Sequence, residues 1–194
     1  MSLGSSKGKV MAMSIKGDHM RYGRVAIWLH WLSALAILCL LVLGFMAAAT
    51  DDQAHKATLL RAHVPLGVLA FLLTLFRLVW LLVDRRPPPL ASLPLWQAFA
   101  ERFVHGCLYL LIVLLGASDI GLVVLSGAVP ALFFGAPSPL PDFPSYAPMI
   151  VHGTAAFALL GLLVLHIVAA LYHQFVRQDR LLQRMGVGAS ELRN

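Results

Sequence analysis

Histidines are the residues of this sequence best suited to chemistry. Five of the eight lie in long apolar stretches, and these are His30, His63, His105, His152 and His166. Ionisable side chains inside a bilayer are costly and usually serve a function, and neutral imidazole is a common metal ligand. We therefore expect a ligand site. The competing interpretation is that the imidazoles only hydrogen-bond from one helix to another.

His152 and His166 are spaced so that they face the same side of one helix. They are fourteen residues apart, which in an α-helix is a rotation of about 1400°, within ~40° of the starting direction, and a rise of about 21 Å. The spacing predicts two imidazoles on one helix face, each near a different membrane surface.

Successive spanning helices run in opposite directions, and this pairs the other histidines by depth. His63, at the start of the second apolar stretch, shares its depth with His152, whereas His30 lies nearer the depth of His166. Two imidazoles on opposite sides of a flat macrocycle ligate a low-spin haem b with no open position, which suits electron transfer. The sequence has no CxxCH motif for covalent attachment of haem.

The elements that must position these residues are membrane-spanning helices. Hydrophobic residues make up 59% of the 194 residues and charged residues only 12%, against about 25% charged in a soluble domain. Four apolar stretches, 25–48, 63–83, 103–125 and 149–176, match the ~20 residues needed to cross a bilayer. The sequence predicts an all-α integral membrane protein, a four-helix transmembrane bundle. We expect the first helix to be retained, because it is longer than the apolar part of a signal peptide.

Positive charges predict the orientation. Twelve Lys and Arg residues lie in three flanks: Lys7, Lys9, Lys16, Arg21 and Arg24; Arg85, Arg86 and Arg102; Arg177, Arg180, Arg184 and Arg193. The other two connections hold only Lys56 and Arg61. Since positive flanks stay on the cytoplasmic side, both termini are expected in the cytoplasm. The same topology explains the net charge of +6 without a nucleic-acid partner.

Three parts of the chain follow from this pattern. Residues 1–22 are expected to be a disordered cytoplasmic segment, 23–185 the transmembrane domain and 186–194 a cytoplasmic tail. The proline run after the second span predicts a linker with a short surface helix that carries Trp96 and Phe99. The connection after the third span is too rich in proline to cross the membrane.

From Tyr22 to about Met185 the sequence resembles the prokaryotic cytochrome b561 family, whose compact members include bacterial superoxide oxidase. The motifs that carry the resemblance are RVAIWLHWLSA, LLRAHVPLGVLAFLLTLFRLVW, HGCLYLL and VHGTAAFALLGLLVLHIVAALYHQFVRQDRLLQRM. The resemblance implies a bacterial inner-membrane protein with two haems b. It implies that His30 and His166 ligate the cytoplasm-side haem iron, and that His63 and His152 ligate the periplasm-side one.

The resemblance also suggests roles for neighbouring residues. His105 aligns with another family histidine, and by depth it competes with His30, so we interpret it as a neighbour of the haem or of a quinone. His173, nearly in phase with His166, is a second candidate for supplying protons to quinone. Trp31 either packs against haem or quinone or anchors the helix at the membrane interface.

Cations and one anion complete the candidate site. Arg77 either pairs with haem propionates or a buried carboxylate, or extends its charge toward the inner membrane surface. Lys56 and Arg61 either contact propionates and attract superoxide or are solvated flank residues. The family often has proline in the middle of the third helix, where this chain has Ser118 and Asp119. Asp119 is expected near the outer haem or a proton path, or at the end of the helix.

The resemblance implies a superoxide oxidase-type enzyme, which takes electrons from superoxide on the periplasmic side and reduces ubiquinone in the membrane. The alternative is a cytochrome b subunit, or a partner of a periplasmic redox protein, without superoxide oxidation of its own. A third is a structural bundle without cofactor. A homodimer is left open.

Overall fold

The computed structural model describes residues 15–17, 22–84, 94–135, 139–179 and 181–187, in which every regular element is a helix. The long helices are α1 (Arg24–Ala49), α2 (Gln53–Val83), α3 (Leu95–Ser126) and α5 (Ala147–Leu171), the last continued by a π-helical turn, η2 (Tyr172–Val176). All four are long and apolar enough to span a membrane. The predicted all-α bundle of four transmembrane helices is confirmed.

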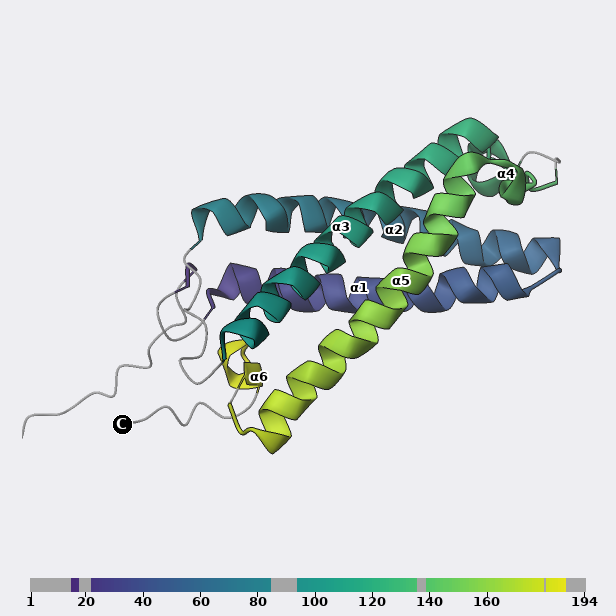
Figure 1. Cartoon of the computed structure of the whole chain (residues 1–194). Helices are drawn as coiled ribbons and strands as arrows, with labels where there is room; N and C mark the ends of the chain where they lie inside the picture. Colours follow the sequence, from purple (N-terminus) through teal and green to yellow (C-terminus); the bar gives the residue numbers. More distant parts are fainter. Residues whose placement is uncertain (1–14, 18–21, 85–93, 136–138, 180, 188–194) are drawn as a thin grey trace, which may run out of the picture.

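The bundle consists of two antiparallel hairpins (Figure 1). α1 packs along α2 and α3 packs along α5, and the hairpins meet mainly through α2 and α3. Packing between α1 and α5 is much sparser. The side of the bundle between α1 and α5 is therefore formed by one helix from each hairpin.

Two short elements mark the ends of the bundle. α4 (Val129–Phe133) lies at the end where α3 leads toward α5, and this is called the loop end. The 3-10 turn η1 (Phe143–Ser145) follows α4 in the chain. α6 (Leu181–Arg184) lies at the opposite end, where the backbone N–H of Tyr22 donates to the Arg184 carbonyl over 3.4 Å. This second end is called the termini end.

Local sequence signals explain where the helices begin and end. The Asp52 carboxylate accepts hydrogen bonds from the backbone N–H groups of Ala54 and His55 and so caps the start of α2. Pro148 lies in the first turn of α5, where a missing N–H costs nothing. Gly127 ends α3 in the left-handed conformation, with a φ of 64°.

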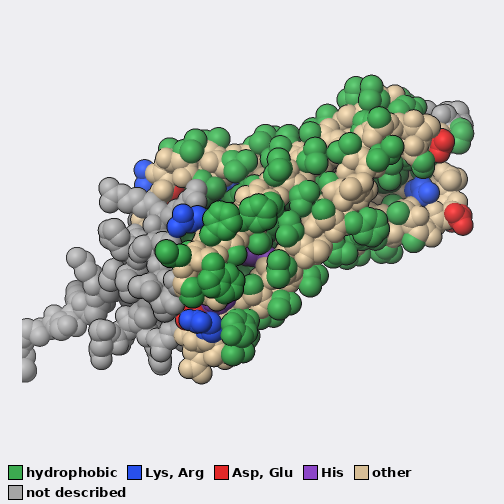
Figure 2. All heavy atoms as spheres, viewed as in Figure 1, with side chains coloured by type: hydrophobic (Ala, Val, Ile, Leu, Met, Phe, Trp, Pro, Cys, Tyr) green, Lys and Arg blue, Asp and Glu red, His purple; other side chains and the backbone are tan. Residues whose placement is uncertain are grey.

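The surface is that of a protein surrounded by lipid. Hydrophobic side chains cover the visible face along the length of the helices, and Lys, Arg, Asp and Glu gather at the two ends (Figure 2). Only 11–22% of the most apolar stretch of each helix is buried within the chain. Most apolar side chains must therefore contact the membrane, while small buried residues such as Ala70 and Ala155 let the helices approach one another.

Two predicted helix starts are wrong. α2 begins at Gln53, ten residues before the expected start, and α3 begins at Leu95 instead of 103. Apolar runs mark the part of a helix that suits lipid, but polar residues such as Gln53 continue the same helix into water. Trp96 and Phe99 therefore belong to the first turns of α3 and not to a separate surface helix.

Other predictions about the connections have different outcomes. The segment after α3 does not span the membrane, as expected, since its described part forms only α4 and η1. The linker 85–93 lies outside the described residues, as do most of the two terminal segments. The domain bounds 1–22, 23–185 and 186–194 stay predictions.

Candidate functional site: two histidine layers

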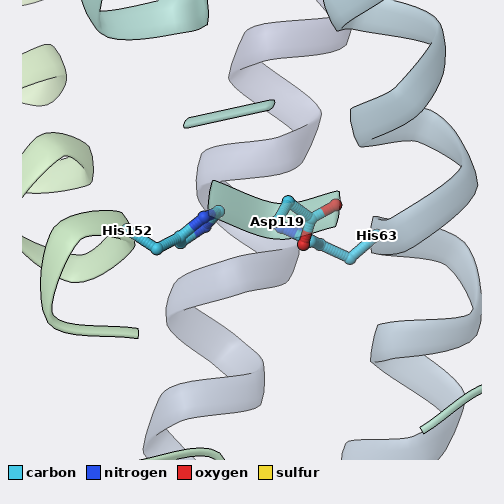
Figure 3. A group of neighbouring side chains, drawn as sticks. All are labelled: His63, Asp119 and His152. Atoms are coloured by element: carbon cyan, nitrogen blue, oxygen red, sulfur yellow. The ribbon is translucent and has the colours of Figure 1, made fainter. Parts of the chain in front are cut away.

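The first pair of histidines lies toward the loop end. His63 of α2 and His152 of α5 point toward one another (Figure 3), with their ring centres 6.1 Å apart. Two imidazoles that ligate one metal ion through nitrogen–metal bonds of about 2 Å on opposite sides have ring centres roughly 6 Å apart. The spacing of this pair thus fits an iron between the two rings.

Asp119 of α3 lies beside this pair (Figure 3). The carboxylate is buried, with 6% of the residue exposed, and its ligand atom lies within 4.8 Å of those of both histidines. Of the interpretations considered for Asp119, a position at the end of the helix is excluded, because α3 continues to Ser126. Asp119 adds a carboxylate to the immediate surroundings of His63 and His152.

Ser118 orients the His152 ring. Its hydroxyl donates to the Leu115 carbonyl over 2.9 Å, and its oxygen lies 3.2 Å from His152 Nδ1. A hydroxyl has one proton to donate, so Nδ1–H of His152 is the donor in the second bond. Nε2 of His152 is then left without a proton and free to ligate a metal, as is typical of histidine ligands whose other nitrogen is hydrogen-bonded.

Glycine on α1 makes room for the ring of His63. A Cβ on Gly44 would lie only 3.0 Å from His63 Cε1. His63 Nδ1 is buried and has no hydrogen-bond partner among the described residues. A buried nitrogen without a partner is costly unless another group satisfies the ring, which is consistent with a ligand site.

A second pair lies toward the termini end. The ring centres of His30 on α1 and His166 on α5 are 6.5 Å apart, again close to the spacing for two ligands of one iron. His30 Nδ1 is also buried without a partner in the described structure. Because this pair joins α1 to α5, it lies across the sparsely packed side of the bundle.

His105 of α3 belongs to the same level. Its ring centre is 5.1 Å from that of His166, and its Nδ1–H donates to the Glu101 carbonyl over 2.7 Å. A 5.1 Å separation is shorter than two ligands on opposite sides of one iron require. Geometry therefore favours His30 over His105 as the partner of His166.

Arg77 of α2 also acts at this level. Its Cζ lies 5.3 Å from the centre of the Tyr109 ring on α3. This contact is within the range of a cation–π interaction. Arg77 thus packs toward α3.

One spacing recurs on all four long helices. Each helix places one residue at each level, always fourteen residues apart: Gly44 and His30 on α1, His63 and Arg77 on α2, Asp119 and His105 on α3, His152 and His166 on α5. The four residues toward the loop end are called the loop-end layer, and the other four the termini-end layer. The sequence argument found this spacing only on α5; the same count from His63 and His105 leads to Arg77 and Asp119, which it named as candidates on other grounds.

The remaining candidates at the termini end, Trp31 and His173, make hydrogen bonds or ion pairs within that end of the bundle. The Trp31 indole N–H donates to the Met185 carbonyl over 3.0 Å, and its ring centre is 5.2 Å from that of His30. His173, in the π-helical turn, pairs through Nδ1 with the Asp179 carboxylate at 2.7 Å, and Arg177 Nε lies 3.3 Å from the same oxygen. Trp31 therefore links the segment around Met185 to α1, the helix that carries His30.

The candidates at the loop end lie in the first turns of α2. Arg61 Nε–H donates to the carbonyl of Leu132 in α4 over 2.6 Å, so that Arg61 fastens α4 to α2. Lys56 lies one turn and a half before it on the same helix and is half-buried. Both residues are at the end of the bundle that holds the loop-end layer.

Paired histidines at two levels of a membrane-spanning helix bundle define a class: haem-carrying membrane proteins that transfer electrons. Comparisons with known proteins agree. Residues 21–188 match the model of the family "Prokaryotic cytochrome b561". Cytochrome b561 homolog 2 of Escherichia coli (strain K12) is 31% identical over 180 residues, which cover 89% of this chain and 95% of that protein.

The chain belongs to the prokaryotic cytochrome b561 family. It is a multi-pass transmembrane protein of electron transfer, and membership implies that it binds haem b.

Proposed function

We propose that each layer holds one haem b and that the protein carries single electrons between them across the membrane. The observation that carries this proposal is the pair of similar distances between ring centres, 6.1 Å for His63 and His152 and 6.5 Å for His30 and His166. A haem b with two imidazole ligands alternates between ferric and ferrous iron without binding oxygen.

The chain's own residues prepare both levels for this cofactor. The hydrogen bond of Ser118 to Nδ1 of His152 leaves Nε2 of that ring available to ligate iron, and Gly44 leaves space beside His63. At the other level, the 5.1 Å approach of His105 to His166 suits a neighbour of the site and not a ligand.

Quinone reduction is proposed for the termini end, because reduction of a quinone needs protons as well as electrons. The imidazole of His105 can accept a proton and pass it on, and His173 of the π-helical turn pairs with the carboxylate of Asp179, which follows that turn. Trp31 borders the same region. With both termini in the cytoplasm, as the flanking charges suggest, ubiquinone would be reduced on the cytoplasmic side.

Superoxide is the proposed electron donor at the loop end, which is then the periplasmic side. The support is the family resemblance, together with Lys56 and Arg61 near that end. A protein donor is the second candidate, since three described aspartates, Asp51, Asp52 and Asp142, accompany those two cations. These charges nearly balance, so the attraction of an anion to this end would be weak, and a protein donor does not depend on it.

The experiment begins with purified full-length protein and measures haem b per chain from its pyridine complex. Two haems b per chain are expected, and a colourless protein with adequate haem supply would contradict the proposal. The reduced haem spectrum is then followed after addition of superoxide, with and without ubiquinone. Rapid reduction that ubiquinone reverses supports the superoxide donor; stable two-haem protein that superoxide leaves oxidised supports a protein donor.

A further inference from the structure

The two layers differ in the charge that each places beside its histidines. In the loop-end layer the charged residue is Asp119, whose buried carboxylate lies within 4.8 Å of the ligand atoms of His63 and His152. The nearest polar neighbour described for this pair, Ser118, is neutral. The loop-end layer thus combines two imidazoles with a carboxylate.

In the termini-end layer the charged residue is Arg77, at the corresponding position fourteen residues after His63. Its guanidinium keeps its proton at all physiological pH values, and its Cζ lies 5.3 Å from the centre of the Tyr109 ring on α3, the helix that carries His105. The third histidine of the layer, His105, already donates Nδ1–H to the Glu101 carbonyl. This layer thus combines its imidazoles with a cation.

Charge beside a haem shifts its reduction potential in a known direction. Ferric haem carries one more positive charge than ferrous haem, so a neighbouring anion stabilises the ferric form and a neighbouring cation stabilises the ferrous form. Both effects are strong where the surroundings exclude water. Hydrogen bonds and burial around the ligands also tune the potential.

We propose that Asp119 and Arg77 set the two haem potentials apart, low in the loop-end layer and high in the termini-end layer. The proposal rests on the two-haem function above. Each electron accepted from a one-electron donor at the loop end then moves downhill: the loop-end iron returns from ferrous to ferric as the termini-end iron goes from ferric to ferrous. A quinone takes the electron from there. The charge pair makes the transfer directional.

Redox titration followed by haem absorbance tests this proposal on the full-length protein at one fixed pH. His30→Ala should retain only the loop-end haem, and His63→Ala only the termini-end haem. The midpoint potential measured in each variant is thereby assigned to one layer. We expect the loop-end midpoint to be lower by at least a tenfold change in the reduction equilibrium, which is about 59 mV for one electron.

Two substitutions then remove the charges with little change in shape. Asp119→Asn is expected to raise the loop-end midpoint by a tenfold change in equilibrium or more, and to move the other midpoint much less. Arg77→Gln is expected to lower the termini-end midpoint by a similar factor, while Arg77→Lys, which keeps the charge, restores most of the shift. If Arg77→Gln reduces haem binding, the shift of the loop-end midpoint in Asp119→Asn still tests the proposal.

Matched controls remove exposed charges at the same ends. Asp142→Asn at the loop end and Arg24→Gln at the start of α1 should leave both midpoints unchanged. The proposal is overturned if the loop-end haem has the higher midpoint, or if Asp119→Asn shifts it no more than Asp142→Asn does. Two haems with equal midpoints would overturn this charge effect alone, whereas one haem per chain would overturn the two-haem function itself.

Discussion

The loop-end and termini-end layers are built on the same positions of the same four helices, yet their chemistry differs. In both layers α5 supplies a histidine that faces a second histidine about 6 Å away, from α2 in one and from α1 in the other. The two remaining helices add glycine and aspartate in the loop-end layer, but arginine and a third histidine in the termini-end layer. Helix register thus fixes where a metal ligand lies, while the residues on the other helices are free to differ in charge and size.

The largest expected effect is a loss of haem from one layer at a time. It is tested on α5, which contributes one histidine to each layer. His152→Ala and His166→Ala should each reduce haem content from two per chain to one, because each removes one ligand of one pair. The remaining haem should be the one lost in the other variant, which spectra and midpoint potentials would show. Loss of both haems in either variant would contradict independent layers. His55→Ala, an exposed histidine in the first turn of α2, is the control.

The next effect tests the space beside His63. Gly44→Val places methyl groups where even a Cβ would be 3.0 Å from the imidazole, so we expect loss of most of the loop-end haem with the termini-end haem retained. Gly161→Val on α5, where an added Cβ meets nothing within 4 Å, is the matched control and should keep both haems. Equal haem content in the two variants would show that His63 does not depend on this contact.

A smaller effect is expected at the hydrogen bond between Ser118 and His152. Ser118→Ala removes the acceptor for Nδ1–H, and loss of such an outer contact typically weakens metal binding about 10- to 100-fold. Competition for haem between the purified protein and a haem-binding apoprotein measures this for each layer. Ser118→Thr, which keeps the hydroxyl, should restore binding. A normal loop-end affinity in Ser118→Ala would mean that the hydrogen bond does not orient the ligand.

The smallest effect concerns Trp31, whose hydrogen bond connects the segment around Met185 to the helix that carries His30. Trp31→Phe removes a hydrogen bond to the Met185 carbonyl, a loss of about 1 kcal/mol. Amide hydrogen exchange should become faster in residues 181–187 and stay unchanged around α4. Uniform acceleration in both regions would instead indicate a general loss of stability.

Much of this arrangement could be predicted from the sequence because hydrophobic length and helix periodicity are strong signals. Both identify four spans and place His152 and His166 on one face. The expected starts at 63 and 103 were wrong because polar residues that cap and extend a helix, such as Asp52 and Gln53, look like a connection in hydropathy alone. Relative depth still paired His63 with His152, because α2 and α5 both run from the loop end to the termini end and each histidine lies in the first half of its helix.

Other parts could not be predicted for physical reasons. Depth could not separate His30 from His105, which lie at one level on different helices, and only their distances to His166 distinguish them. The bond from Trp31 to Met185 depends on how the chain turns back after η2. In contrast, the levels of Asp119 and Arg77, which the sequence analysis named as candidates, could have been predicted, because each lies fourteen residues after a histidine on its own helix.

The position of α5 has a consequence for biosynthesis. It is the last of the four long helices to be synthesised, and it provides one histidine to each layer. The first hairpin alone carries His30 and His63, but neither has its partner until α5 has entered the membrane. With each pair ligating a haem as proposed, haem loading would follow insertion of the final helix, and a chain that stops translation after α3 would have no complete pair with which to retain haem.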